Sequence, residues 1–257
     1  MDTILEADSP RIQSLARADS ILSAVMNHGE AMPLSDLTGV LGLNKTTVFN
    51  LAESLVVLGF LSRSTSPKGY KLGLRCLELG RKVAKDLPIL EISRPALREL
   101  CQVTGETVNL AVPYLQEAIL VEALQSQQGV RATAYAGARS NYHSSACGKA
   151  LLANFSEERR EWFFKHVKLV QHTEHTIIDR AQLEKQLQDV RQNGFAVEQQ
   201  ENELGASCVA VPIFGPFGEV VASISVTGVM HRMTDVKVEE IIDRLKTHAA
   251  DISGKLN

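Results

Sequence analysis

The chain of 257 residues is longer than one ordinary domain, and 44% of its residues are hydrophobic and 22% charged. This composition excludes a mostly disordered chain, and no run approaches the roughly 18 apolar residues that a membrane helix needs. The net charge of −3 argues against a chain that is basic throughout.

The four cysteines, Cys76, Cys101, Cys147 and Cys208, lie far apart and form no CxxC pair. We therefore expect no disulfide framework and a reducing compartment, the cytoplasm. Residues 1–12 carry three acidic side chains and no signal-peptide pattern, which predicts that the chain is not exported.

The charge is divided unevenly along the chain. Residues 11–85 hold 10 Lys and Arg against 5 Asp and Glu, residues 86–257 hold 17 against 22, and residues 1–10 hold 3 acids. A basic first third joined to an acidic remainder indicates that only the first part meets a polyanion such as DNA.

The basic third predicts three short helices. The spacing of apolar residues places them at 14–27, 34–41 and 45–58, with Ser14 and Asn44 as N-caps of the first and the third. The third helix has two faces. Its predicted buried face holds Val48, Leu51, Leu55 and Leu58. Its outward face carries Thr46, Thr47, Asn50 and Ser54.

Two strand-like segments, 59–63 and 69–72, follow the helices, with turn-forming residues at 64–68 between them. Three helices and a small hairpin are typical of a winged helix-turn-helix. Short polar side chains on the third helix would reach base edges in the major groove. Phosphates would be contacted by the basic residues Lys45, Arg63 and Lys68. The pattern also fits a helical adaptor whose polar face meets only water.

A fourth helix is predicted at 74–85, and Asp86-Leu87-Pro88 interrupts it, because a proline disfavours helix at the residue before it. This is the clearest boundary in the sequence. We expect a first, DNA-binding domain at 11–73, a connecting helix at 74–87 and a second domain at 88–257.

The acidic remainder alternates strands and helices irregularly, with hairpins, which predicts an α+β domain with a largely antiparallel sheet. The expected strands are 107–113, 117–123, 132–135, 207–214 and 219–227. The expected helices are 89–104, 143–155, 157–166, 179–193 and one from about 235.

Catalytic motifs are sparse in this remainder. Gly148-Lys149 lacks the upstream glycine of a phosphate loop, and no GxSxG elbow occurs. Cys147 or Cys208 with His143 as its base would make a cysteine-dependent hydrolase, although such cysteines are more often small buried apolar residues. A metal site is not indicated at the histidines His166, His172 and His175, because no cysteine or acid accompanies them at the spacing of metal ligands. We expect no catalytic residue, no metal and no cofactor.

Small polar groups indicate a ligand pocket instead. Ser225 and Thr227 alternate with apolar neighbours and so project from one sheet face, and Cys208 lies on the other late strand. The helix start at 144–148 offers free backbone N–H groups to an anion. These groups would suit a small carboxylate, or they satisfy hydrogen bonds within the core.

The chain also resembles the IclR-type transcriptional regulators. The stretches that carry the resemblance follow in the expected order: 14–22, 34–48, 69–73, 105–111, 143–153, 194–205 and 223–228. The resemblance implies a winged helix-turn-helix, a linker helix and a GAF-like effector domain. Where that family commonly has an arginine on the recognition helix, this chain has Asn50, which suits a pairing with adenine.

The resemblance further implies an effector site. In family members that bind small organic acids, the ligand meets backbone amides at a helix start, here Ala146 and Cys147. It also meets an acid, a cysteine and two hydroxyls, which are here Glu198, Cys208, Ser225 and Thr227. Family members can carry aspartate and serine where this chain has Glu198 and Thr227, so the ligand can differ while the architecture stays.

The sequence therefore predicts a ligand-responsive transcriptional regulator whose effector is a small organic acid or a metabolite of aromatic catabolism. Its expected partners are double-stranded operator DNA and further copies of itself, as a homodimer or a dimer of dimers, because pseudo-palindromic operators need two reading heads. No membrane partner is expected. The alternatives are a cysteine-dependent hydrolase and a ligand-sensing adaptor that binds no DNA.

Overall fold

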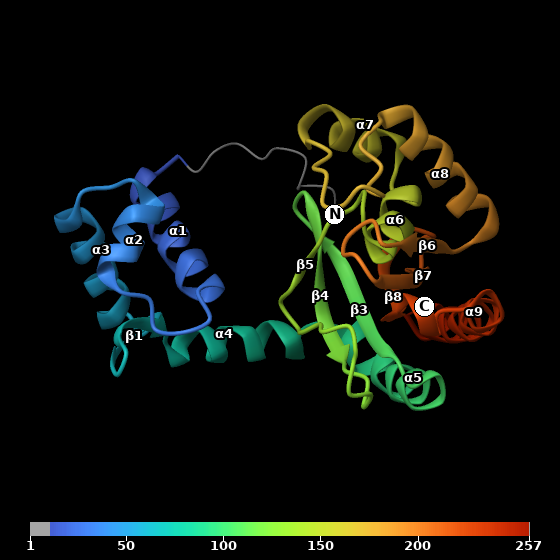
Figure 1. Ribbon diagram of the computed structural model, residues 1–257, viewed down its shortest axis with the longest axis horizontal. Coiled ribbons are helices and arrows are strands. Elements are labelled where there is room, and N and C mark those ends of the chain that lie inside the picture. Colours follow the sequence, from blue (N-terminus) through green and yellow to red (C-terminus); the bar gives the residue numbers. More distant parts are fainter. Residues whose placement is uncertain (1–10, 257) are drawn as a thin grey trace. The chain divides into compact units, whose positions relative to one another are not determined.

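The computed structural model describes residues 11–256 (Figure 1). Residues 1–10, on which the expectation about export mainly rests, lie outside the described residues. The chain divides into two compact units, one that ends at Asp86 and one that begins at Leu87. Across residues 11–256, no helix combines the length and the apolar character needed to cross a membrane.

The first unit is built of four helices and one antiparallel hairpin. These are α1 (Gln13–Asn27), α2 (Leu34–Leu41), α3 (Lys45–Val57), β1 (Leu61–Thr65), β2 (Lys68–Leu72) and α4 (Leu74–Lys85). Asn44 caps α3 as predicted, since its Oδ1 accepts the Thr47 N–H at 2.8 Å. The prediction for Ser14 was wrong. Ile12 is the N-cap residue of α1, and its carbonyl accepts the N–H groups of Leu15 and Ala16.

The core of this unit lies where α1, α2, α3 and the hairpin meet, and it includes Ile21, Leu37, Val48, Ala52, Leu55, Leu61 and Tyr70. The prediction that Leu58 is buried was wrong, because α3 ends at Val57 and the C-cap residue Leu58 is 62% exposed. The hairpin lies closer to its turn than predicted, since β1 begins at Leu61 rather than Gly59 and ends at Thr65 rather than Arg63. Thr65 pairs with Lys68, so most of the expected turn belongs to the strands.

The second unit contains a six-stranded antiparallel sheet in the order β5-β4-β3-β8-β7-β6. The strands are β3 (Thr107–Tyr114), β4 (Glu117–Leu124), β5 (Arg139–Ser140), β6 (Ala196–Gln199), β7 (Ala206–Phe214) and β8 (Val220–Val229). The helical elements are α5 (Pro88–Thr104), α6 (Ala146–Ala153), α7 (Glu157–His166), α8 (Arg180–Asn193), η1 (Met230–Arg232) and α9 (Asp235–Leu256).

Helices cover both faces of this sheet. Figure 1 shows α5 and α9 on one face and α6 with α8 on the other. The predicted α+β class with an antiparallel sheet is confirmed. The strand predictions were wrong in three places: residues 132–135 form no strand, and the short strands β5 and β6 were missed. Side chains hold the 132–135 segment instead, since the Thr107 hydroxyl donates to the Ala132 carbonyl at 2.7 Å.

Candidate effector and DNA-binding sites

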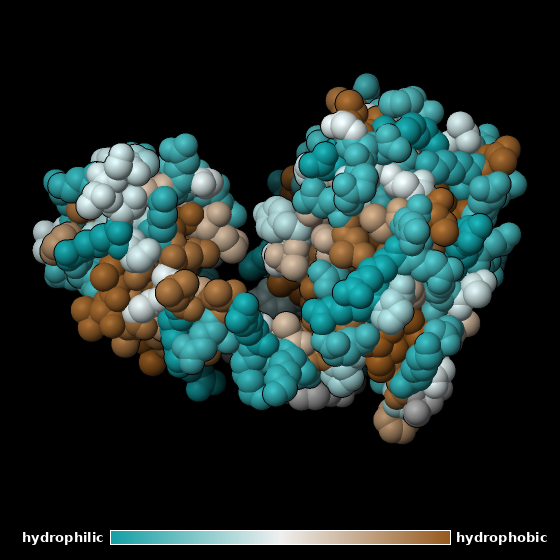
Figure 2. All heavy atoms as spheres, turned by 90° about the horizontal axis from the view of Figure 1, so that it is seen from below, coloured by the Kyte–Doolittle hydropathy of each residue, from teal (hydrophilic) through white to brown (hydrophobic). Residues whose placement is uncertain are grey.

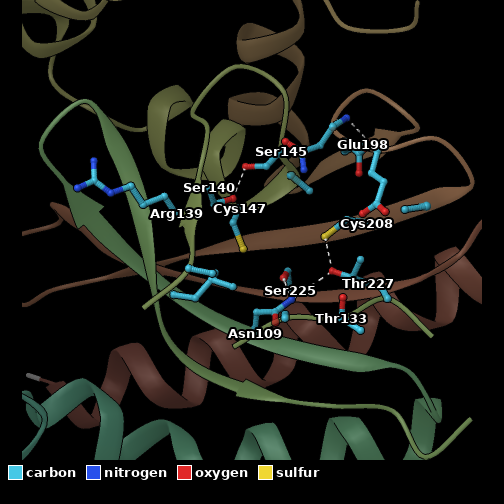
Figure 3. A pocket seen from close by; sticks show the side chains of 18 of the residues that line it. Asn109, Thr133, Arg139, Ser140, Ser145, Cys147, Glu198, Cys208, Ser225 and Thr227 are labelled. Atoms are coloured by element: carbon cyan, nitrogen blue, oxygen red, sulfur yellow. Dashed lines mark hydrogen bonds between the residues drawn. The ribbon is translucent and has the colours of Figure 1, made fainter. Parts of the chain in front are cut away.

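The second unit contains a cavity of about 170 Å³ between the α6 face of the sheet and the segment 132–140. Figure 3 shows polar side chains pointing into this space from α6, β6, β7 and β8. All six residues predicted for the effector site line it: Ala146, Cys147, Glu198, Cys208, Ser225 and Thr227.

The strand register brings three of these residues into one row. Glu198 on β6 pairs with Cys208 on β7, and Cys208 pairs with Thr227 on β8. Ser225 lies two residues before Thr227 and projects from the same face, as the alternation of β8 predicts. The Thr227 hydroxyl donates to the Cys208 Sγ at 3.1 Å.

The start of α6 forms the wall opposite this row. Ser145 caps the helix, since its Oγ accepts the Gly148 N–H at 3.0 Å. The N–H groups of Ala146 and Cys147 belong to the first helical turn, which has no intrahelical acceptor for them. A Cβ at position 148 would lie 2.1 Å from the Asn141 carbonyl oxygen, so only glycine allows this close approach. Gly148 is therefore needed for the close packing of α6 against the backbone at Asn141.

Glu198 is the acidic group of the cavity. Its Oε1 accepts the N–H groups of Glu201 and Asn202 at 2.6 and 3.1 Å. Burial raises the pKa of Glu198 to about 7, although these two hydrogen bonds favour the charged form. The carboxyl group therefore keeps its proton to a higher pH than an exposed glutamate does.

A buried ion pair ties two walls of the cavity together. Lys149 on α6 is fully buried, and its Nζ lies 2.5 Å from Glu201 Oε1 on the turn after β6. Burial lowers the pKa of Lys149, and the Glu201 carboxylate opposes that shift. The Ser144 hydroxyl also donates to Asn202 Oδ1 at 3.1 Å. Both bonds hold Glu198 in position relative to α6.

Several residues that line the cavity escaped prediction: Asn109, Thr133, Arg139, Ser140 and Asn202. Asn109 lies on β3 opposite Ser225 of β8. Alternation along β3 shows from which face of the sheet Asn109 projects only once that pairing is known. A strand was expected at 132–135, and no pattern in the sequence indicated that segment 132–140 forms a cavity wall.

The features required for a cysteine hydrolase are not brought together. The His143 ring contacts the Val170 carbonyl at 2.9 Å, and within residues 11–256 neither Cys147 nor Cys208 hydrogen bonds to it. Burial raises the pKa of both thiols, which opposes thiolate formation. In the described part of the chain, no three His, Cys, Asp or Glu side chains are grouped to hold a metal ion.

The polar face of α3 lies open in the first unit. Lys45, Thr46, Asn50 and Ser54 are exposed, Thr47 is half-buried, and Lys68 is exposed on the hairpin. The Ser54 hydroxyl donates to the Asn50 carbonyl at 2.8 Å. Phe49, which the sequence analysis did not select, is 44% exposed on the same helix.

Arg63 has a partner that was not expected. Its guanidinium forms an ion pair with Glu53 of α3, and the Tyr70 hydroxyl donates to the same carboxylate at 2.9 Å. Burial raises the pKa of Tyr70 to about 12, so the hydroxyl remains a donor. The charge of Arg63 is therefore shared with α3 rather than left free.

Comparison with known families decides the identity of the chain. Residues 14–65 match the IclR helix-turn-helix domain, and residues 81–254 match the C-terminal domain of bacterial IclR transcriptional regulators. The chain belongs to the IclR family. Its two units correspond to the helix-turn-helix domain and the α/β domain of these regulators.

Relatives of this IclR-family regulator span nearly its whole length. The regulator KipR of Bacillus subtilis is 34% identical over 229 residues, 89% of this chain and 91% of KipR. The repressor AllR of Escherichia coli K12 is 31% identical and covers 95% of this chain and 90% of AllR. An IclR homolog from Microbacterium hydrocarbonoxydans, crystallised with 4-hydroxybenzoate, superposes with a TM-score of 0.79 at 25% identity, covering 95% of this chain and 98% of that one.

Proposed function

We propose that this IclR-family regulator is a repressor that binds operator DNA through α3 and the β1–β2 hairpin and responds to a small organic acid in the cavity. The observation that carries the proposal is the convergence of Ala146, Cys147, Glu198, Cys208, Ser225 and Thr227 on one cavity. The name of AllR, a repressor, supports the sign of regulation.

The cavity chemistry supports a small acid as the effector. Free N–H groups at the start of α6 favour an anion, and the hydroxyls of β8 supply further polar contacts. A cavity of about 170 Å³ is close to the roughly 150 Å³ that accommodates benzene in a protein core. The 4-hydroxybenzoate bound by the Microbacterium homolog is an acid near this size.

DNA contact is proposed for the exposed residues of the first unit. In this proposal, base edges are contacted by Thr46, Thr47, Asn50 and Ser54, and Asn50 pairs with adenine. Phosphates are contacted by Lys45 and Lys68. Arg63 contacts a phosphate only when its ion pair with Glu53 opens or when it binds Glu53 and the phosphate together.

We also propose that the regulator acts in the cytoplasm as a homodimer or a dimer of dimers. Helix α4 is strongly amphipathic, yet within the described part of the chain none of its residues is buried. A second copy would cover its apolar side chains and supply the second reading head that a palindromic operator needs.

The first experiment incubates the purified full-length protein with fragmented genomic DNA at moderate salt and sequences the retained fragments. We expect enrichment of a short pseudo-palindrome and loss of retention when a panel of small acids, including 4-hydroxybenzoate, is added. Retention of fragments without a shared motif would contradict the regulator proposal.

A variant ties the enriched motif to α3. Asn50→Ala should relax base preference at one position of each half-site and leave the other positions unchanged, since a bidentate contact is worth about 1–3 kcal/mol of discrimination. An unchanged motif would remove Asn50 from the base contacts. Asn193→Ala, the same change at an exposed position of α8, serves as a control and should leave the motif unchanged.

A further inference from the structure

Asn109 lies in the sheet wall of the cavity, beside two of the residues already assigned to effector binding. It sits on β3 directly opposite Ser225 of β8, and it is 5% exposed. Figure 3 shows its side chain alongside Ser225 and Thr227. A polar amide at this depth must find hydrogen-bond partners for both its nitrogen and its oxygen.

The nitrogen of Asn109 is fully used. Its Nδ2 donates to Ser225 Oγ at 3.3 Å and to Thr227 Oγ1 at 3.2 Å. Thr227 gives its own hydroxyl hydrogen to Cys208 Sγ, so towards the amide its oxygen can only accept. This chain of bonds sets which end of the amide faces β8 and turns the oxygen away from it.

The oxygen of Asn109, in contrast to the nitrogen, lacks a partner. Asn109 Oδ1 is buried and has no hydrogen-bond partner among residues 11–256. An acceptor buried without a partner is unfavourable, and a site built this way discriminates strongly for a ligand that satisfies it.

The rest of the cavity wall offers this acceptor no compensating cation. The Arg139 guanidinium hydrogen bonds to Glu117 at 3.2 Å and lies over the Tyr114 ring, and its side chain is half exposed. Lys149 is engaged by Glu201. Glu198, which also lines the cavity, is engaged through its Oε1 by the N–H groups of Glu201 and Asn202.

We infer that Asn109 is a specificity-determining residue, and that the effector carries a hydrogen-bond donor, a hydroxyl or an N–H group, which meets Asn109 Oδ1. The inference rests on the proposed effector site and narrows its ligand to an acid with two unlike ends. One end is an anion for the N–H groups of α6, and the other is a donor for β3. An acid without such a donor leaves the amide oxygen unpaired.

Calorimetric titration of the full-length protein with matched acids tests this. Each pair differs by one hydroxyl: glycolate with acetate, lactate with propionate, and 4-hydroxybenzoate with benzoate. We expect the hydroxylated member of at least one pair to bind about tenfold more tightly. In Asn109→Leu this ratio should fall to within about threefold, while binding of the unhydroxylated acid changes little.

Two further variants separate recognition from folding. Asn109→Asp keeps an oxygen acceptor, so it should weaken both members of a pair together and preserve their ratio. Asn154→Leu makes the same change outside the cavity, where the amide bonds to the Ala150 carbonyl, and should preserve both affinities. Circular dichroism confirms that each variant is folded.

The inference is wrong if Asn109→Leu keeps the preference for the hydroxylated acid, if the unhydroxylated acids bind equally well, or if no hydroxylated acid binds. Failure of the proposed regulator function would show separately, as a lack of operator enrichment, because these titrations contain no DNA.

Discussion

Glu198 shows how burial sets the chemistry of a single side chain. It is 3% exposed, and burial raises its pKa to about 7 against the ordinary value of 4.5. Two backbone N–H groups stabilise its anion, yet they do not offset the lost hydration.

The protonation of Glu198 predicts a pH-dependent stability. Between about pH 4.5 and 7 the folded state holds a proton that the unfolded state has lost, so the free energy of unfolding falls as pH rises. Glu198→Gln keeps an oxygen for the two N–H groups and removes this penalty. We expect the variant to be more stable than wild type at pH 8, by up to about 3 kcal/mol, and equal to it at pH 4.

Urea denaturation at pH 4, 6 and 8 measures this difference. Glu203→Gln, an exposed position on the same turn, is the control and should show no such trend. An equal offset between Glu198→Gln and wild type at all three pH values would mean that the carboxyl is not protonated in the fold.

At the scale of elements, the Glu53 carboxylate joins α3 to the hairpin. It accepts from Arg63 of β1 and from Tyr70 of β2. The arrangement fixes the hairpin against α3, and it also neutralises Arg63, for which a phosphate contact is proposed. Exposed ion pairs contribute little to stability, so the main consequence is expected in DNA binding.

We predict that Glu53→Gln strengthens DNA binding. The amide still accepts from Tyr70, but it no longer neutralises Arg63, which then contacts a phosphate. The slope of log affinity against log salt should steepen by about one. Fluorescence anisotropy on the enriched operator between about 50 and 200 mM salt measures the slope.

The control for charge alone is Glu78→Gln on α4, which releases Arg75 instead. It should leave the slope nearly unchanged. Adding Arg63→Gln to Glu53→Gln should abolish the gain. A gain that persists in the double variant would show that Arg63 does not contact the DNA.

At the scale of the whole molecule, the proposed self-association is supported by the surface of the first unit. Figure 2 shows hydrophobic side chains gathered on this unit. Exposed apolar residues are frequent near the junction of α3, β2 and α4: Val57, Leu58, Leu72, Leu74 and Leu77. Contiguous apolar surface of this kind is unusual unless a partner covers it.

We predict that Leu74→Asp combined with Leu77→Asp converts the protein to a monomer. These side chains are 82% and 55% exposed in the single chain, so their replacement should not disturb the core. Operator affinity should fall at least about a hundredfold, because the two reading heads are no longer linked. Sedimentation velocity and anisotropy measure both effects.

Val236→Asp on α9, 69% exposed in the second unit, is the matched control and should leave oligomeric state and affinity unchanged. A double variant on α4 that still sediments as a dimer would place the interface elsewhere.

Local signals in the sequence were enough for most elements. The Asn44 cap, the end of α2 at Gly42 and the α4 boundary before Pro88 depend on residues within one helical turn of each other. Alternation along β8 was enough to put Ser225 and Thr227 on one face. The residues alone thus indicated the hydroxyls, Cys208 and the α6 start, while the resemblance to the family added Glu198.

Long-range pairing decided the rest. The row of Glu198, Cys208 and Thr227 requires the register of three strands, and Lys149 meets Glu201 from 52 positions away. Arg63 was expected to be free for phosphate because its partner Glu53 lies on another element. Asn109 and the 132–140 wall were missed for the same reason. Periodicity and capping report on a residue's neighbours in the chain, whereas a cavity and its unpaired acceptor exist only after distant strands have paired.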